Sequence, residues 1–335
     1  MPKTILICDD SRMARKQLAR CLPEDWPVEI IYAEHGREAI EIIQDSIPDL
    51  MFLDLNMPVF DGYETLEELN HRTIEMDILV VSGDIQPTAQ ERVLELGALD
   101  FVKKPISKEV LLKALQKHGF INSKSSRKNL VLADSNAEMS EKEFIDAMQE
   151  ISNVAMGRAG DVLARFLDVF VELPIPKVNH IELSELHMAL QFSAQDETVS
   201  SVCQGFIGPG LSGEALLIFN DSSFKNIASL MEYNGEINEK IELELLMDIA
   251  NILVGACLQG ISDQLDINLS QGHPIVLGQH LKVKELIDNN VKNWDKALSI
   301  EINYRIENKG INCDLLLLFT ESCVGPLKKL LKYIV

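Results

Sequence analysis

The first third of the chain alternates short runs of apolar residues with longer stretches in which apolar residues recur every three or four positions. Short apolar runs are typical of strands buried on both faces, and the spaced pattern is typical of helices that cover them. Five such pairs predict an α/β fold with a doubly wound, five-stranded parallel sheet. The predicted strands are residues 5–8, 28–33, 50–53, 78–81 and 101–102, and the predicted helices lie near 11–21, 36–46, 62–70, 88–96 and 107–118.

A polar segment interrupts this pattern. Residues 120–139 are rich in Asn, Ser and Lys and carry no hydrophobic period, so they are predicted to form a linker. We therefore expect one domain at residues 1–119 and a second at residues 140–335.

The second predicted domain contains an internal repeat. Asn153 is followed by Pro176, and the pair Asn251 and Pro274 repeats this distance 98 positions later. Each Asn lies in a long helical stretch that is followed by strands and a short helix. This repeat predicts a pseudo-twofold α/β domain with halves at about 140–235 and 238–335. The strand sequences 213–219 and 313–319 match at a shift of 100 positions, and short helices are predicted after them at 222–233 and 322–334.

The net charge and the lengths of the apolar runs indicate which classes of partner the protein does not bind. The 335 residues include 52 acidic and 31 basic side chains, a net charge of −21, whereas nucleic-acid binding depends on clustered Lys and Arg. No apolar run reaches the ~18 residues that cross a bilayer, and the N-terminal one is too short for a signal peptide. The six cysteines form no CxxC pair, and the seven histidines show no metal-ligand spacing. We expect a cytoplasmic protein with reduced cysteines that binds neither nucleic acid nor membrane.

Polar residues follow four of the five predicted strands. Asp9 and Asp10 end the first strand, Asp54 the third, and Ser82 and Lys104 follow the fourth and fifth. Because the carboxyl ends of parallel strands meet at one edge of the sheet, these side chains are expected to share a cleft. Three neighbouring carboxylates repel one another and need a cation, and oxygen ligands suit Mg²⁺. The lysine and the hydroxyl would then bind phosphoryl oxygens.

These residues resemble the receiver domain of CheY-type response regulators over residues 1–119. The resemblance rests on DD at 9–10, LDLNMPxxxG at 53–62, VSG at 81–83 and KKP at 103–105. It implies a flavodoxin-like fold and transfer of a phosphoryl group from a histidine kinase to Asp54. It also implies that Mg²⁺ is bound by Asp9, Asp10, Asp54 and the backbone carbonyl of Asn56, and that Ser82 and Lys104 contact the phosphate. Phe101 would be the aromatic switch residue, without the hydroxyl that a tyrosine would supply.

A second candidate site lies in the repeat. Asp146, Glu150 and Asn153 are spaced i, i+4 and i+7, so they share one face of a helix. Glu244, Asp248 and Asn251 repeat this spacing. In the first helix these polar residues are expected to point outward, opposite a buried apolar face. The expected buried residues are Phe144, Met148, Ile151, Ala155, Ala159, Val162 and Phe166.

This duplicated pattern resembles the CheC/CheX/FliY family of receiver phosphatases over residues 140–335. The family signature reads Asp or Ser, three residues, Glu, two residues, Asn, about 22 residues, Pro. The first copy matches it throughout, whereas the second has Glu244 and Asp248 at the two acidic positions. Asp248 is one methylene shorter than the expected Glu, and catalytic geometry is sensitive at that scale. Whether this second site is active stays open.

The chemistry that the resemblance implies is hydrolysis of an aspartyl phosphate. Phosphoryl transfer depends mostly on positioning and electrostatics, and a carboxamide can orient a water with one donor and one acceptor. Asn153 would orient the water, and Glu150 would pair with the active-site lysine of the receiver. Asp146 could support Glu150 or make a contact of its own. No metal is needed from this domain.

Three hypotheses follow for the second domain. It could hydrolyse the aspartyl phosphate of a separate CheY-type receiver, under control of phosphorylation at Asp54. It could instead bind phosphorylated receivers, or other chemotaxis proteins, without hydrolysis. Finally, it could act in cis on Asp54 of its own chain, because a linker of about 20 residues spans ~25 Å as a random coil.

Overall fold

In the computed structural model, the residues described are 3–121, 139–182, 198–233, 235–282, 296–306 and 309–332. They fall into two compact units: the first extends to Glu150 and the second runs from Ile151 to Ile334. The boundary lies within a single helix, α6 (Glu141–Leu167), so the first turns of this helix belong to the first unit. Most of the linker predicted at 120–139 lies outside the described residues, and the predicted domain boundaries stay a prediction.

The first unit contains the predicted parallel sheet. Its strands are ordered β2-β1-β3-β4-β5, and every neighbouring pair is parallel. The elements are β1 (Lys3–Cys8), α1 (Arg12–Cys21), β2 (Val28–Ala33), α2 (Gly36–Asp45), β3 (Leu50–Leu53), α3 (Gly62–His71), β4 (Ile78–Ser82), α4 (Pro87–Glu95), β5 (Asp100–Lys103) and α5 (Lys108–Lys117).

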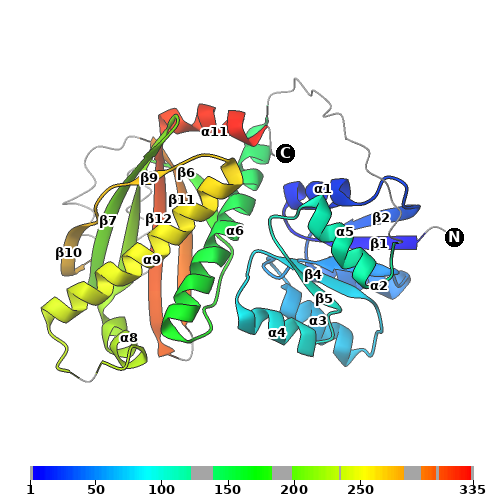
Figure 1. The fold of residues 1–335 in the computed structure, drawn as a ribbon, viewed down its shortest axis with the longest axis horizontal. Helices are drawn as coiled ribbons and strands as arrows, with labels where there is room; N and C mark the ends of the chain where they lie inside the picture. The colour runs from blue at the N-terminus through cyan, green and yellow to red at the C-terminus, as the bar shows by residue number, and fades with distance from the viewer. Residues whose placement is uncertain are drawn as a thin grey trace. The chain divides into compact units, whose positions relative to one another are not determined.

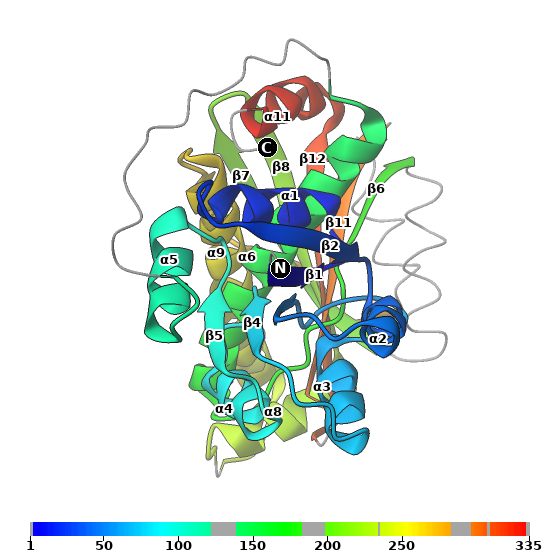
Figure 2. The same ribbon diagram turned by 90° about the vertical axis from the view of Figure 1, so that its right-hand side faces the viewer.

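Helices cover both faces of this sheet, as a doubly wound fold requires (Figure 2). Because successive strand residues point to opposite faces, Leu6 and Ile7 enter different cores. Helices α2, α3 and α4 pack on the face of Leu6, and helices α1 and α5 pack on the face of Ile7. The predicted α/β architecture of the N-terminal part is confirmed, and the carboxyl ends of its parallel strands lie at one edge of the sheet.

The second unit is built around an antiparallel sheet in the order β10-β7-β8-β12-β11-β6, with β9 paired to β7. The first half comprises β6 (Lys177–Glu182), β7 (Thr198–Gly208), β8 (Leu211–Asn220), the 3₁₀ helix η1 (Asp221–Ser223) and α8 (Phe224–Leu230). The second half comprises α9 (Glu239–Leu265), β9 (Ser270–Gln271), β10 (Ile275–Lys282), β11 (Lys296–Ile306), β12 (Ile311–Thr320), the 3₁₀ helix η3 (Glu321–Cys323) and α11 (Val324–Leu331).

The predicted internal repeat is confirmed by this topology. Helices α6 and α9 both have 27 residues, and β7 and β11 both have 11. At the centre of the sheet Leu216 pairs with Leu316, its own equivalent in the repeat, so the pseudo-twofold axis passes through this pair. The halves also exchange their first long strands, because β6 pairs with β11 and β10 pairs with β7. Neither half therefore completes its sheet alone.

The two long helices lie on the same face of this sheet (Figure 1). A Cβ atom on Gly260 of α9 would lie 2.8 Å from Cα of Ala155 on α6, so glycine permits the close approach of the helices. Gln264 also donates a hydrogen bond to the carbonyl of Ile151, at 2.9 Å. Arg158 and Asp263 form an ion pair beside this contact.

The buried face predicted for α6 is correct for its first five apolar residues but wrong at Val162 and Phe166, which are both 42% exposed. Leu163 and Leu167 are buried in their place. After Ala159 the buried stripe continues in steps of four residues, because a helix with 3.6 residues per turn does not keep a fixed repeat of seven.

His280 joins three elements of the second unit. Its Nδ1 atom lies 2.9 Å from a carboxylate oxygen of Asp221 in η1, and its Nε2 atom lies 3.2 Å from Glu242 in α9. The hydrogen bond to Asp221, with the charges of Asp221 and Glu242, raises the pKa of His280 above its usual value.

Replacing His280 with Gln is expected to make the stability of the second unit less dependent on pH. A histidine whose folded pKa is raised stabilises fully below pH ~6.5, and the stabilisation is lost as pH rises through the raised value. Thermal midpoints of the wild type and His280→Gln should therefore differ most near pH ~5.5 and converge near pH ~9. His273→Gln, an exposed histidine nearby, is the matched control. A gap between wild type and His280→Gln that widens with pH would contradict the assignment.

Candidate functional site

The predicted strand-end residues come together at one edge of the parallel sheet. Asp9 and Asp54 are almost fully buried, and one ligand oxygen from each of Asp9, Asp10 and Asp54 lies within 4.8 Å of the others. Lys104 reaches into the same cluster, with its Nζ atom 2.8 Å from Asp9 and 3.4 Å from Asp54. The ladder of βα units thus brings these four residues together, as the sequence predicts.

Two carboxyl groups of the acidic cluster, those of Asp10 and Asp54, have raised pKa values. Burial, followed by repulsion from Asp9 and Asp54, raises the pKa of Asp10 to about 8. Burial also raises the pKa of Asp54 to about 6, although Lys104 opposes the shift. Burial lowers the pKa of Lys104, but Asp54 and Asp9 outweigh it, so this pKa rises well above its usual value. Carboxylates that are crowded in this way favour a bound cation.

The residues present fit Mg²⁺. Both carboxylate oxygens of Asp54 are buried and accept no hydrogen bond within the described part of the chain. With Asp9 and Asp10 they offer the hard oxygen ligands that Mg²⁺ prefers, and Mg²⁺ usually keeps waters or phosphate oxygens in its remaining positions. We assign these three side chains as the candidate ligands, with the carbonyl of half-buried Asn56 as the proposed fourth.

The other predicted receiver residues lie around this cluster. Ser82 is fully buried, and its Oγ atom accepts a hydrogen bond from the backbone N–H of Asp84 at 3.1 Å. Phe101 is half-buried and packs on the core beneath α2, α3 and α4. Their roles in binding phosphate and in switching stay predictions.

Arg15 is a structural part of the site that sequence reasoning did not single out. Its Nη1 atom donates to the backbone carbonyls of Asp9 at 2.6 Å and Asp10 at 3.1 Å, and its Nη2 atom pairs with Glu34 at 2.7 Å. The guanidinium therefore holds the backbone of the aspartate pair in place. The available signal was its position one helical turn after Ser11, on the helix that follows the two aspartates.

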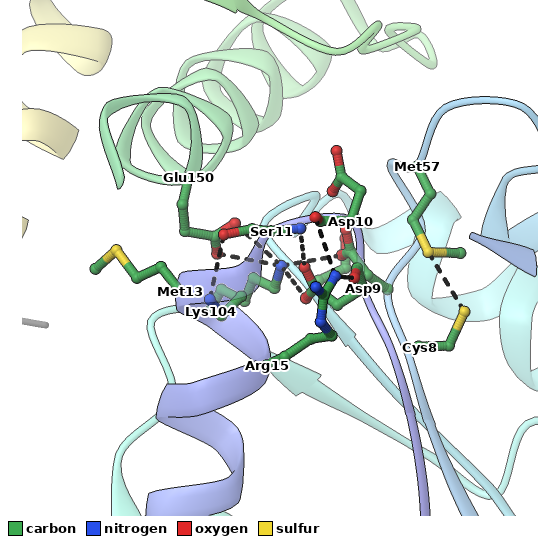
Figure 3. Close-up of polar contacts among 12 residues, drawn as sticks. Cys8, Asp9, Asp10, Ser11, Met13, Arg15, Met57, Lys104 and Glu150 are labelled. Atoms are coloured by element: carbon green, nitrogen blue, oxygen red, sulfur yellow. Dashed lines mark hydrogen bonds and ion pairs between the residues drawn. The ribbon is translucent and has the colours of Figure 1, made fainter. Parts of the chain in front are cut away.

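Two residues of the first motif, Asp146 and Glu150, lie in the first unit and make contacts at or beside this cluster. Figure 3 shows Glu150 of α6 directed toward Lys104, with one carboxylate oxygen 3.1 Å from Nζ. Asp146, one turn earlier, accepts hydrogen bonds from the backbone N–H groups of Arg12 and Met13. Burial raises the pKa of Glu150 to about 8, against the opposing charge of Lys104.

The expectation that the first motif points outward is therefore wrong for Glu150 and Asn153, whereas Asp146 is half-buried. Glu150 is 7% exposed and Asn153 is 5% exposed. The expectation took charged and amide groups as solvated, but Glu150 has exchanged water for the ammonium group of Lys104. Spacing on one helix cannot reveal such a contact, because its partner lies 46 residues earlier in the chain.

The second motif differs in its surroundings. Glu244, Asp248 and Asn251 of α9 are all exposed, although they repeat the spacing of the first motif. Pro176 and Pro274 directly precede β6 and β10, so each marks the entry from the helix into the first long strand of its half. The two copies therefore share their fold but present their polar faces differently.

Residues 5–116 match the response regulator receiver domain family. This part of the chain is a response regulator receiver domain. Receiver domains belong to two-component signalling by aspartyl phosphorylation, with a histidine kinase as phosphodonor. Among curated proteins, Response regulator RR06 of Streptococcus pneumoniae serotype 2 (strain D39 / NCTC 7466) is 38% identical over 112 residues, which are 33% of this chain and 51% of that protein. The chain spans about half the length of that relative.

Two solved structures are similar to parts of the chain. FliY of Thermotoga maritima is 20% identical and covers 58% of this chain and 98% of its own, with a TM-score of 0.43. The CheX-CheY-BeF3-Mg complex of Borrelia burgdorferi contains a chain that is 26% identical and covers 36% of this chain and 92% of its own, with a TM-score of 0.34. Within the described residues, every helix is too short or too polar to cross a bilayer.

Proposed function

We propose that this protein is a response regulator that is phosphorylated on Asp54 and hydrolyses the aspartyl phosphate of receiver domains with its α6 motif. The substrate that the geometry favours first is its own phosphorylated Asp54. The observation that carries the proposal is the Glu150–Lys104 ion pair at 3.1 Å, on a lysine that also lies 3.4 Å from Asp54. It is the contact expected from the family resemblance, in which Glu150 pairs with the active-site lysine of a receiver.

The reaction is attack of water on the aspartyl phosphate, which breaks the bond between phosphorus and the Asp54 oxygen and releases inorganic phosphate. Mg²⁺, when bound by Asp9, Asp10 and Asp54, supplies charge neutralisation at the phosphoryl oxygens. Lys104 neutralises further charge, and Glu150 keeps the helix on the lysine. The side-chain amide of Asn153, one turn beyond Glu150 on the same helix face, would orient the water with one acceptor and one donor. Its oxygen would accept a hydrogen bond from the water, and its N–H would donate one to the water oxygen.

The test follows the loss of phosphoryl label from Asp54 after a small-molecule phosphodonor has been removed. Under the proposal the intact protein loses label faster than Asn153→Ala. The rate is unchanged by dilution, because catalyst and substrate share one chain. A rate that rises with protein concentration would instead place the reaction between molecules.

A second candidate function is action on, or binding of, a separate phosphorylated receiver. The exposure of Glu244, Asp248 and Asn251 favours it, because a partner in solution can reach these side chains. Accelerated loss of label from an added CheY-type receiver would indicate hydrolysis. If the added receiver stays bound to the protein but loses its label only at the spontaneous rate, the function is binding alone.

Exchanging the two acids of the second motif is expected to improve its activity in trans. The double variant Glu244→Asp/Asp248→Glu recreates the order of the first motif and returns the longer acid to the position that pairs with a receiver lysine. Errors of about 1 Å can cost about 100-fold in rate, so the gain should be about tenfold or more. The gain is measured as the rate of label decay on an added receiver, with Asn153→Ala present so that the first motif does not contribute. If the gain survives the further change Asn251→Ala, the motif is not its source.

A further inference from the structure

The backbone N–H groups at the start of α1 all find acceptors, but two of those acceptors come from far along the chain. The N–H of Ala14 donates to Oγ of Ser11, the N-cap residue, at 3.2 Å. The N–H groups of Arg12 and Met13 donate to the two carboxylate oxygens of Asp146, at 3.2 and 2.9 Å. Asp146 thus uses both oxygens on the receiver's first helix.

This contact is chemically specific. The first N–H groups of a helix have no partner within the helix, and they carry the positive end of its dipole. A carboxylate satisfies two of them at once and forms charge-assisted bonds, which are stronger than neutral ones. Since the contact is made to backbone atoms, it does not depend on the side chains that a receiver carries at these two positions.

We infer that Asp146 is a positioning residue that recognises the N-terminus of the receiver's first helix; this inference rests on the proposed function. Asp146 and Glu150 are separated by about 6 Å along α6 and lie on one face. One binds backbone at the start of α1, and the other binds the active-site lysine (Figure 3). Two anchors fix both the position of the helix along its axis and its rotation, whereas Glu150 alone would leave the helix free to pivot about Lys104.

The inference also accounts for the order of the two acids in the motif. The shorter side chain of Asp146 meets backbone groups close to the helix surface, and the longer side chain of Glu150 reaches into the pocket toward Lys104. In the second copy the longer acid, Glu244, stands first and the shorter, Asp248, second. A receiver placed on α9 in the same register would therefore be held less well at both points.

The first experiment compares amide hydrogen exchange at Arg12 and Met13 in the unphosphorylated wild type, Asp146→Asn and the control Asp168→Asn. The control removes one carboxylate charge just beyond α6, from an exposed residue whose positive φ of 52° suits Asn. Asp146→Asn removes one acceptor oxygen and the charge, so exchange should rise about tenfold or more at one or both of these amides, while Ala14, which is bonded to Ser11, stays protected. Unchanged exchange at Arg12 and Met13 would overturn the inference.

The second experiment measures loss of label from Asp54 in the same proteins. Asp146→Asn, which keeps one acceptor oxygen, should slow it about tenfold, and Asp146→Ala, which accepts neither bond, should slow it further. If Asp146→Asn loses amide protection at Arg12 and Met13 but loses label from Asp54 at the wild-type rate, the positioning role is overturned. If the wild type decays no faster than Asn153→Ala, the proposed hydrolysis fails. In that case, amide protection at Arg12 and Met13 that still depends on Asp146 would support the recognition of α1 without any hydrolysis.

Discussion

Replacing Asn153 with Ala is expected to slow the loss of phosphoryl label from Asp54 by about 100-fold, to the rate that the receiver's own groups support. Removing one positioned catalytic hydrogen-bonding group typically costs this much. Lys104 and the Mg²⁺ ligands remain in the variant, so phosphorylation itself should proceed normally. Label decay after removal of the phosphodonor measures the effect directly.

The buried position of Asn153 requires a control for folding. Asn153→Asp keeps the size of the side chain but replaces its amide donor with a carboxylate oxygen, so it should be slow as well. Asn268→Ala makes the same truncation at an exposed position between α9 and β9 and should decay like the wild type. Thermal midpoints show whether each variant is folded at the assay temperature. A folded Asn153→Ala that decays at the wild-type rate would remove Asn153 from the mechanism.

Replacing Lys104 with Met is expected to destabilise the first unit by about 3–5 kcal/mol in metal-free buffer, or about 10 °C in its thermal midpoint. The ammonium group lies within 3.4 Å of carboxylate oxygens from Asp9, Asp54 and Glu150. Without it, these buried acids must bind protons or repel one another. Because they bind protons more readily at low pH, the loss should be larger at pH ~8 than at pH ~5.

Two comparisons test this reasoning about Lys104. Lys103→Met removes a charge from the neighbouring exposed residue and should leave the midpoint almost unchanged. The double variant Lys104→Met/Glu150→Met replaces the ion pair with apolar side chains and should recover part of the stability, because one buried acid is gone. Mg²⁺ should also raise the midpoint of Lys104→Met by binding the remaining acids. A single variant as stable as the wild type at pH ~8 would contradict this description of the site.

The receiver half of the site could be predicted from sequence because its geometry follows from connectivity. Asp9, Asp54 and Lys104 each follow a short buried strand, and parallel strands place such residues at one edge. Likewise, the match between 213–219 and 313–319 predicted the repeat, which the pairing of Leu216 with Leu316 confirms. These inferences depend on local pattern and topology alone.

The contacts of α6 could not be predicted in the same way. Helical spacing showed that Asp146, Glu150 and Asn153 share a face, but it carried no information on what that face meets. Burial of Glu150 depends on a lysine 46 residues away, and the bonds of Asp146 are made to backbone atoms, which leave no trace in residue type. Arg15 was missed for a related reason, since it binds carbonyl groups rather than a side chain predicted to be functional.

The pairing of Glu150 with Lys104 on one chain has a consequence for signal duration. Under the proposed function every molecule hydrolyses its own aspartyl phosphate. The lifetime of the phosphorylated state is therefore set by the fold rather than by the cellular abundance of a separate enzyme. Fluctuations in copy number would change how many signals are emitted but not how long each one lasts. The fusion would therefore encode a fixed response time.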